Sequence, residues 1–162
     1  MICFTGQSRA SDEIIRDQVS SIMESDAQAI ENMHQLKSDA IEMKQALLRG
    51  DIPGVAEVLD RSWQAKKATA RRISNNLIES LWDIAHRNGA LAGKISGAGG
   101  GGFMVFLVDP DERVRLMRAL KEGGGIPDSV SLANEGVEAW STGSGRRREP
   151  SGLQRRPECN SG

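Results

Sequence analysis

One run of glycines is the stretch whose composition most directly indicates chemistry. It reads Lys94-Ile95-Ser96-Gly97-Ala98-Gly99-Gly100-Gly101-Gly102, and five of its last six residues are glycine. Glycine loses more conformational freedom on folding than any other residue, so such a dense run inside an ordered domain needs a reason. A loop without side chains can turn several backbone N–H groups toward one anion. We therefore predict a phosphate-facing loop.

The segments on either side of the loop decide which kind of phosphate loop it is. Ala90–Ile95 and Phe103–Val108 are apolar and read as strands. The dinucleotide motif G-x-G-x-x-G must open a helix, and here a strand follows. A P-loop is excluded because Phe103 stands where its lysine should be. A plain glycine hairpin without a ligand stays open as the alternative.

Three cationic residues gather near the end of a predicted helix: Lys66, Lys67 and Arg71. Lys67 and Arg71 are four residues apart and so share a helix face. Such a cluster could bind an anion, or it could be an exposed helix end that the helix dipole favours. Lys94 has two interpretations as well, a phosphate contact or a solvated lysine. His34 and His86 are isolated and give no metal or triad spacing.

Composition bounds the class of protein. The 162 residues, 38% hydrophobic and 27% charged, fit one globular domain. Residues 1–140 are mildly acidic, so we expect no nucleic-acid partner. Two cysteines give neither a disulfide framework nor a metal spacing, and we find no signal peptide or membrane-length apolar run. These features predict a cytoplasmic protein without a membrane partner.

The periodicity of apolar residues predicts helices alternating with short strands. After Trp140 the chain is rich in Ser, Gly, Arg and Pro, so we expect a domain over 1–140 and a disordered tail over 141–162. The opening strand begins almost at Met1, which hints at a truncated chain. The predicted helices span about 11–25, 26–49, 53–70, 76–88 and 112–121, and the predicted strands span 2–5, 91–95, 103–108, 129–132 and 136–140.

The glycine stretch resembles the third motif of the GHMP small-molecule kinases, K-[ILV]-[ST]-G-A-G-G-G-G. Other stretches resemble the D-glycero-D-manno-heptose 7-phosphate kinase branch of that family, although fucokinase-like relatives share much of the pattern. The resemblance covers about residues 1–140. Those stretches are Phe4-Thr5-Gly6-Gln7-Ser8-Arg9, Ser62-Trp63-Gln64-Ala65-Lys66-Lys67, Ile73-Ser74-Asn75, Gly89-Ala90-Leu91-Ala92-Gly93 and Gly136-Val137-Glu138-Ala139-Trp140.

This resemblance implies an α+β, ferredoxin-like C-terminal domain, with an antiparallel sheet and helices packed on one face. It implies ATP and Mg²⁺ as cofactors, with the metal held mainly by an N-terminal domain. That domain carries a second phosphate motif and the acidic residue that acts as a base or orients the substrate hydroxyl, and neither occurs here. We therefore expect the C-terminal part of an ATP-dependent sugar kinase that is inactive alone, with no catalytic residue and no metal ligand in this fragment.

The resemblance also assigns expected roles to residues. The loop residues Gly97, Ala98, Gly99, Gly100, Gly101 and Gly102 would approach the ATP phosphates. Ser96 would offer a hydroxyl near the transferred group, or else bond its own backbone. Lys66, Lys67 and Arg71 would hold the phosphate already on the sugar, with Arg9 as a second candidate.

The expected parent reaction is phosphoryl transfer from ATP to a sugar phosphate, and the expected acceptor is the anomeric hydroxyl of a heptose 7-phosphate. Its partners would be the sugar phosphate, ATP and the missing N-terminal domain. Three alternatives stay open: a non-catalytic ferredoxin-like module that binds a small anion, a fucokinase- or galactokinase-like fragment, and a fragment that only folds. Anion binding by this chain alone would separate the first of these from the others.

Overall fold

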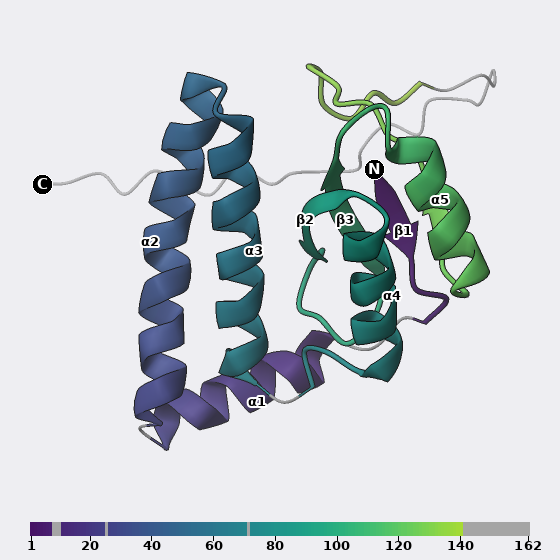
Figure 1. The fold of residues 1–162 in the computed structure, drawn as a ribbon. Helices are drawn as coiled ribbons and strands as arrows, with labels where there is room; N and C mark the ends of the chain where they lie inside the picture. The colour runs from purple at the N-terminus through teal and green to yellow at the C-terminus, as the bar shows by residue number, and fades with distance from the viewer. Residues whose placement is uncertain (8–10, 25, 71, 141–162) are drawn as a thin grey trace, which may run out of the picture. The chain divides into compact units, whose positions relative to one another are not determined.

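The computed structural model describes residues 1–7, 11–24, 26–70 and 72–140, and its compact unit comprises Met1–Ser131. Five helices and four strands make up this unit (Figure 1). In chain order they are β1 (Ile2–Phe4), α1 (Ser11–Met23), α2 (Ala27–Arg49), α3 (Ile52–Thr69), α4 (Asn76–Arg87), β2 (Ala90–Ile95), β3 (Phe103–Val108), α5 (Arg113–Glu122) and β4 (Ile126–Asp128).

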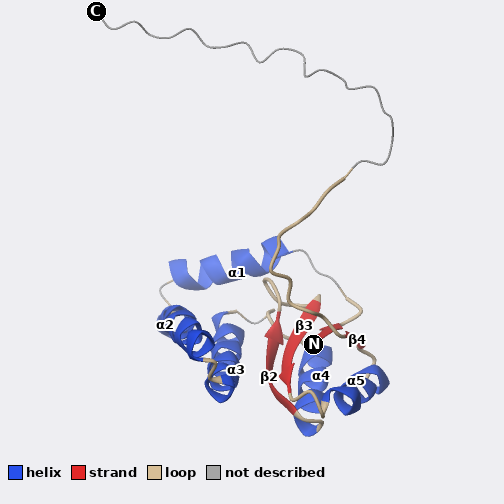
Figure 2. Ribbon diagram, turned by 90° about the horizontal axis from the view of Figure 1, so that it is seen from above, coloured by secondary structure: helices blue, strands red, loops and turns tan. Residues whose placement is uncertain are grey.

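The four strands form one sheet in the order β2-β3-β1-β4, and every neighbouring pair is antiparallel. Helices α4 and α5 cover one face of this sheet (Figure 2). Their side chains Leu81, Ala85 and Leu116 pack with Met104 and Phe106 of β3 in the core. Phe103 and Val105 alternate with those strand residues and are 47% and 37% exposed, so the other face is open. The expected α+β fold, with an antiparallel sheet and helices on one face, is confirmed.

The helix ends follow the signals in the sequence. Asp26 caps α2 by accepting hydrogen bonds from the backbone N–H groups of Gln28 and Ala29, and Asp51 caps α3 in the same way. Gly50 separates the two helices with a φ of 66°, a left-handed conformation that glycine adopts readily. The turn is therefore short, and α2 and α3 pack against each other as an antiparallel hairpin.

The α2–α3 hairpin lies beside the sheet on the β2 side, with α3 between α2 and the strands (Figures 1 and 2). Trp63 on α3 is 1% exposed and stacks obliquely on Trp82 of α4, with ring centroids 6.1 Å apart. The hairpin is thus joined to the core that α4 forms with the sheet. No helix within the described ranges is long and apolar enough to cross a bilayer.

The two strands predicted at 129–132 and 136–140 are wrong. The last strand is β4, and it pairs antiparallel with β1 through Ile126, Pro127 and Asp128. Just before β4, Gly125 passes so close to Cys3 that a Cβ there would lie 2.5 Å from its Sγ. Pro127 lacks an N–H donor, but β4 is an edge strand that tolerates this loss. Leu132 and Val137 are fully or almost fully exposed and join no sheet. The predicted tail, 141–162, lies outside the described residues.

Candidate functional site

The glycine loop leaves the sheet where β2 and β3 end. The last register pair of these strands is Ile95 with Met104, and the backbone N–H of Ser96 donates to the carbonyl of Phe103 at 2.7 Å. The six residues Gly97–Gly102 then form the connection. Both predicted strands are confirmed, so the loop joins two antiparallel neighbours and opens no helix.

The second half of the loop is held by two segments distant in sequence. The backbone N–H of Gly100 donates to the carbonyl of Ile73 at 2.8 Å, and that of Gly102 donates to the carbonyl of Gln7 at 2.7 Å. The backbone N–H of Thr5 donates to the carbonyl of Gly102 at 2.9 Å. Gly100 and Gly101 are buried as a result. The N–H groups of Gly100 and Gly102 are therefore committed to the fold and are not offered to a ligand.

Close packing explains why one of these positions is glycine. Gly99 has a φ of 122°, and a Cβ there would lie 2.8 Å from the carbonyl oxygen of Ile73. Real Cβ atoms essentially never approach another atom so closely. Only a residue without a side chain fits this conformation at this distance.

The first half of the loop is more accessible. Ser96 and Gly97 are exposed, while Ala98 and Gly99 are half-buried. The backbone N–H groups of Gly97, Ala98 and Gly99 have no hydrogen-bond partner among the described residues. Three consecutive unpaired N–H groups can bind an anion because each contributes a partial positive charge. The part of the predicted loop that can face a phosphate is thus Ser96–Gly99.

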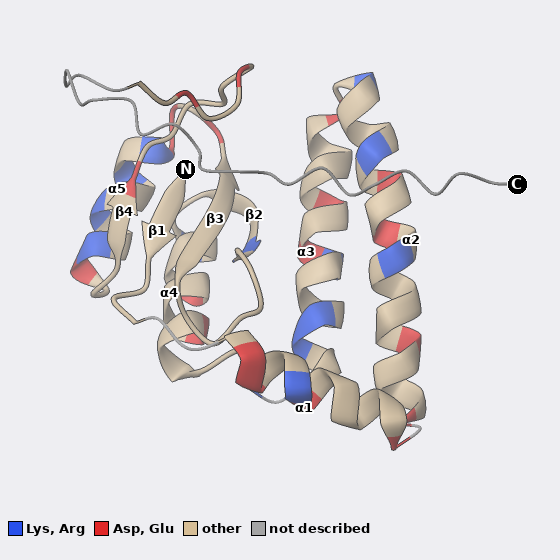
Figure 3. Cartoon of the chain, turned by 180° about the vertical axis from the view of Figure 1, so that it is seen from behind, with Lys and Arg blue, Asp and Glu red and all other residues tan. Residues whose placement is uncertain are grey.

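Two lysines stand beside this accessible half (Figure 3 shows basic positions at the C-terminal end of α3 and on β2). Lys66 Nζ, from the last turn of α3, donates a hydrogen bond to the carbonyl of Gly97. Burial, and then the charge of Lys94 on β2, lower the pKa of Lys66. Neither lysine has a carboxylate within 4.0 Å in the part of the chain that the structure describes. Two neighbouring cations without a counter-charge favour binding of an anion.

Lys67, which neighbours Lys66 in the predicted cation cluster, is paired elsewhere. Lys67 Nζ donates to both carboxylate oxygens of Glu79, at 3.2 and 3.1 Å, and lies 5.6 Å from the centre of the Trp63 ring. It therefore stabilises the contact between α3 and α4. The structure does not describe Arg9 and Arg71, so their predicted roles are not tested.

Sequence reasoning missed Asn75, which holds the loop from the side of α4. Its side-chain Nδ2 donates to the carbonyl of Gly100 at 3.2 Å, and its Oδ1 caps α4 by accepting from the N–H of Ile78 at 3.0 Å. Asn75 lies 25 residues before Gly100, and no spacing rule joins the two. The available signal was that Ile73-Ser74-Asn75 is one of the stretches that resemble the kinase branch.

The fold agrees with what the comparisons with known proteins show. Residues 43–125 match the family described as GHMP kinases C terminal, so the chain belongs to the GHMP kinases. It is 44% identical over 115 residues to the D-glycero-alpha-D-manno-heptose 7-phosphate kinase of Campylobacter jejuni, which covers 71% of this chain and 34% of that protein. The predicted family, and the predicted likeness to the heptose 7-phosphate kinase branch, are confirmed.

Two more similarities bear on function. The chain is 26% identical over 143 residues to the L-fucokinase/L-fucose-1-P guanylyltransferase of Bacteroides fragilis, covering 85% of this chain and 15% of that protein. It also superimposes on a crystal structure of a Campylobacter jejuni protein described as a sugar kinase, with a TM-score of 0.57 and 38% identity over 86% of this chain and 38% of the other. The chain thus spans about a third of the first curated relative, and the rest of that protein has no counterpart here.

Proposed function

We propose that this chain forms the C-terminal side of the active site of an ATP-dependent kinase that phosphorylates a sugar phosphate. The proposed substrate is a heptose 7-phosphate, and the proposed acceptor is its anomeric hydroxyl. The observation that carries the proposal is the half-loop Ser96–Gly99 beside Lys66 and Lys94, in which three backbone N–H groups have no hydrogen-bond partner among the described residues. The similarity to the Campylobacter jejuni heptose 7-phosphate kinase supports the choice of sugar.

In this proposal the half-loop contacts ATP phosphates through backbone N–H groups, which fit charged oxygens without side-chain bulk. Lys66 contacts the phosphate already carried by the sugar. Lys67 does not, because its ammonium group is paired with the carboxylate of Glu79. Ser96 is the exposed first residue of the half-loop, so its hydroxyl can reach a bound ligand. Phosphoryl transfer depends mainly on such positioning and charge neutralisation.

The proposed Mg²⁺ would be held by groups outside this chain. Hard divalent cations prefer carboxylate and carbonyl oxygens as ligands. The half-loop is flanked instead by N–H groups and two lysines, and the described residues contain no cluster of three or more His, Cys, Asp or Glu side chains suited to a metal. The donor set therefore fits the phosphates of a metal-bound nucleotide and not the metal.

We also propose that an N-terminal kinase domain completes the site, so that this chain alone has no turnover. Exposed apolar side chains on α1 lie at helical spacing, and Phe103 and Val105 lie on the open face of the sheet. Such surfaces are typical of contact with another domain. The α1 residues are Ile15, Val19, Ile22 and Met23. An in-frame second phosphate motif upstream of Met1 in the DNA would support this part of the proposal.

A chimera tests the proposed function. This chain would replace the matching C-terminal segment of the Campylobacter jejuni heptose 7-phosphate kinase, and ADP release would be measured with heptose 7-phosphate, L-fucose and D-galactose. We expect turnover with heptose 7-phosphate that falls at least tenfold when Gly99 is replaced by alanine. Preference for L-fucose or D-galactose would favour the fucokinase- or galactokinase-like alternative. Tight ATP binding by this chain alone in calorimetry, with an inactive chimera, would favour the anion-binding module.

A further inference from the structure

Lys66, in the last turn of α3, combines the features of a reactive amine. Its Nζ donates a hydrogen bond to the carbonyl of Gly97, and no carboxylate lies within 4.0 Å of it among the described residues. Burial first, and then the charge of Lys94, lower the pKa of its ammonium group. An amine attacks only in its neutral form, so a larger share of Lys66 is ready to react at neutral pH than of an ordinary lysine.

The half-loop places an anion site beside this amine. Gly97, whose carbonyl Lys66 contacts, is also the first of three residues whose backbone N–H groups have no partner among the described residues. Consecutive N–H groups of this kind bind a phosphate. A phosphate held there lies next to Lys66 Nζ. Lys94 balances part of the phosphate charge, so the bound anion does not by itself restore the protonated amine.

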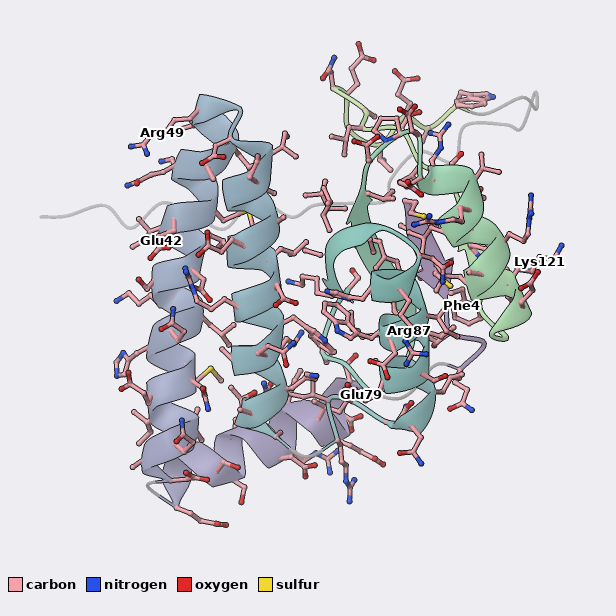
Figure 4. The ribbon with its side chains drawn as sticks, in the orientation of Figure 1. Phe4, Glu42, Arg49, Glu79, Arg87 and Lys121 are labelled. Carbon is pink, nitrogen blue, oxygen red and sulfur yellow. The ribbon has the colours of Figure 1, made fainter. Side chains whose placement is uncertain are left out.

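Two other lysines provide a comparison within the same chain. Lys67 is half-buried like Lys66, but its Nζ is paired with the carboxylate of Glu79 on α4 and lies 5.6 Å from the centre of the Trp63 ring (Figure 4 labels Glu79). Lys121, near the end of α5 and also labelled in Figure 4, is exposed. Access alone therefore predicts that Lys121 reacts fastest with an acylating reagent. An anion site beside the amine predicts instead that Lys66 does.

We propose that Lys66 is an acylation site for small acyl phosphates, in which the half-loop binds the phosphate and presents the acyl carbon to Nζ. The lone pair of Nζ attacks the carbonyl carbon, and a C–N bond forms. The bond between this carbon and the bridging oxygen breaks, and inorganic phosphate leaves with the electron pair. Nζ loses a proton to solvent, so an amide remains and nothing is oxidised or reduced. Holding the phosphate beside the amine makes the attack effectively intramolecular, which raises its rate.

The same geometry favours an acyl phosphate over other acyl donors. Its phosphate is bonded directly to the acyl group, so a single anion site positions the reacting carbon as well. A neutral ester carries no anionic group next to the reacting carbon, and the half-loop then has nothing to hold. The selectivity for Lys66 therefore depends on the phosphate and not on the acyl group.

Acylation changes the charge of the site. The acylated Lys66 is a neutral amide, so Lys94 is the remaining cation of this pair, and the acyl group occupies space beside Gly97. Under the proposed function, this change would weaken the binding of phosphate groups at the half-loop and lower activity. Only this consequence rests on the proposed function, because the acylation itself needs neither ATP nor an N-terminal domain.

The test is acetylation of the 162-residue chain by acetyl phosphate, measured at each lysine by mass spectrometry. Cleavage after Glu57 and Glu79 gives a peptide whose lysines are Lys66 and Lys67, and its fragment ions separate the two. We expect Lys66 to be acetylated about fivefold faster than Lys67 and Lys121, or more. Excess inorganic phosphate should slow the reaction at Lys66 and not at Lys121, and chloride at equal ionic strength should slow neither.

One reagent and two variants serve as controls. p-Nitrophenyl acetate, an acyl donor without a phosphate, should show a clearly smaller preference for Lys66. Lys94→Met should slow the reaction of Lys66 with acetyl phosphate about fivefold, because it removes a phosphate contact and the charge that favours the neutral amine. Lys44→Met removes an exposed lysine of α2 and should leave that rate within about twofold of the parent value.

Three results would each overturn the inference: equal rates at Lys66 and Lys121, no effect of inorganic phosphate at Lys66, or the same preference with p-nitrophenyl acetate. If circular dichroism shows that Lys94→Met does not fold, phosphate competition on the parent chain decides by itself. An active chimera without preferential acetylation of Lys66 would refute this inference and leave the proposed function standing. Preferential acetylation of Lys66 together with an inactive chimera would support this inference and count against the proposed function.

Discussion

Asn75 donates a hydrogen bond from its side-chain Nδ2 to the backbone carbonyl of Gly100 at 3.2 Å. The same side chain caps α4 through Oδ1, which accepts from the N–H of Ile78. One amide group therefore ties the start of a core helix to the middle of the glycine loop. Loop position and helix stability depend on two different atoms of this side chain, so they can be separated by substitution.

The first prediction uses that separation. Asn75→Asp keeps an oxygen that can cap α4 and adds a negative charge that the helix N-terminus favours. It loses the donor to Gly100 and sets a carboxylate near a carbonyl oxygen. We expect little change in the free energy of unfolding but faster hydrogen exchange at the Gly100 and Gly102 amides.

Asn75→Ala is the comparison, because it removes both the cap and the loop contact. It should lower the free energy of unfolding by about 1 kcal/mol, the usual value of a lost cap. Urea denaturation measures the stability of both variants, and NMR-detected exchange measures the loop. Unchanged exchange at Gly100 in Asn75→Asp would show that the side-chain contact does not position the loop.

The second prediction concerns steric room at two glycines. Gly99→Ala puts a Cβ 2.8 Å from the Ile73 carbonyl oxygen and also strains a backbone with φ of 122°. Gly50→Ala, at φ of 66°, has only the backbone strain, because no atom lies within 4 Å of its Cβ. We expect Gly50→Ala to lower the free energy of unfolding by about 1 kcal/mol, and Gly99→Ala to lower it by clearly more. Equal losses in urea denaturation would contradict the close approach between Gly99 and Ile73.

The third prediction follows from the lowered pKa of Lys66. The folded chain holds this proton less tightly than the unfolded chain does. The cost of burying the charge is therefore present in full below the lowered pKa, and it disappears as pH rises toward the ordinary lysine value of about 10.4. The contribution of Lys66 to the free energy of unfolding should rise across that window. Lys66→Met should flatten this rise when urea denaturation is repeated from pH 7 to pH 10.5.

Lys67→Met is the control for that experiment. It leaves Glu79 without its lysine partner and removes the contact with Trp63, so it should lower stability at neutral pH. It should not remove the rise that Lys66 causes. If both variants showed the same profile, the alkaline rise would not come from Lys66.

The fourth prediction concerns Cys3, which is 0% exposed on β1. Burial raises the pKa of its thiol, so both access and the thiolate fraction are low in the folded chain. Iodoacetamide should label Cys3 only under unfolding conditions, as measured by mass spectrometry of its peptide. Rapid labelling of Cys3 in buffer would mean that β1 leaves the sheet easily, and with it the Thr5 and Gln7 contacts to the loop.

The sequence predicted most elements because their signals are local. The N-termini of α2 and α3 are capped by the side chains of Asp26 and Asp51, and α2 ends at Gly50 because glycine adopts the left-handed conformation readily. The glycine run likewise predicted a tight connection between two apolar strands. The strand at 126–128 was missed because its pairing depends on Cys3 and on the space at Gly125, more than 100 residues apart in the chain. Strands were predicted at 129–132 and 136–140 instead, because these segments contain apolar residues such as Leu132, which in the structure are exposed.

The sequence by itself determined that a loop almost free of side chains joins two strands, and that cations stand near a helix end. Only the tertiary structure decided how those parts are used. It committed the N–H groups of Gly100 and Gly102 to distant carbonyls, paired Lys67 with Glu79, and brought Lys66 and Lys94 together. The physical reason is that residue type fixes what a group can bind, whereas long-range packing fixes which partners remain within reach.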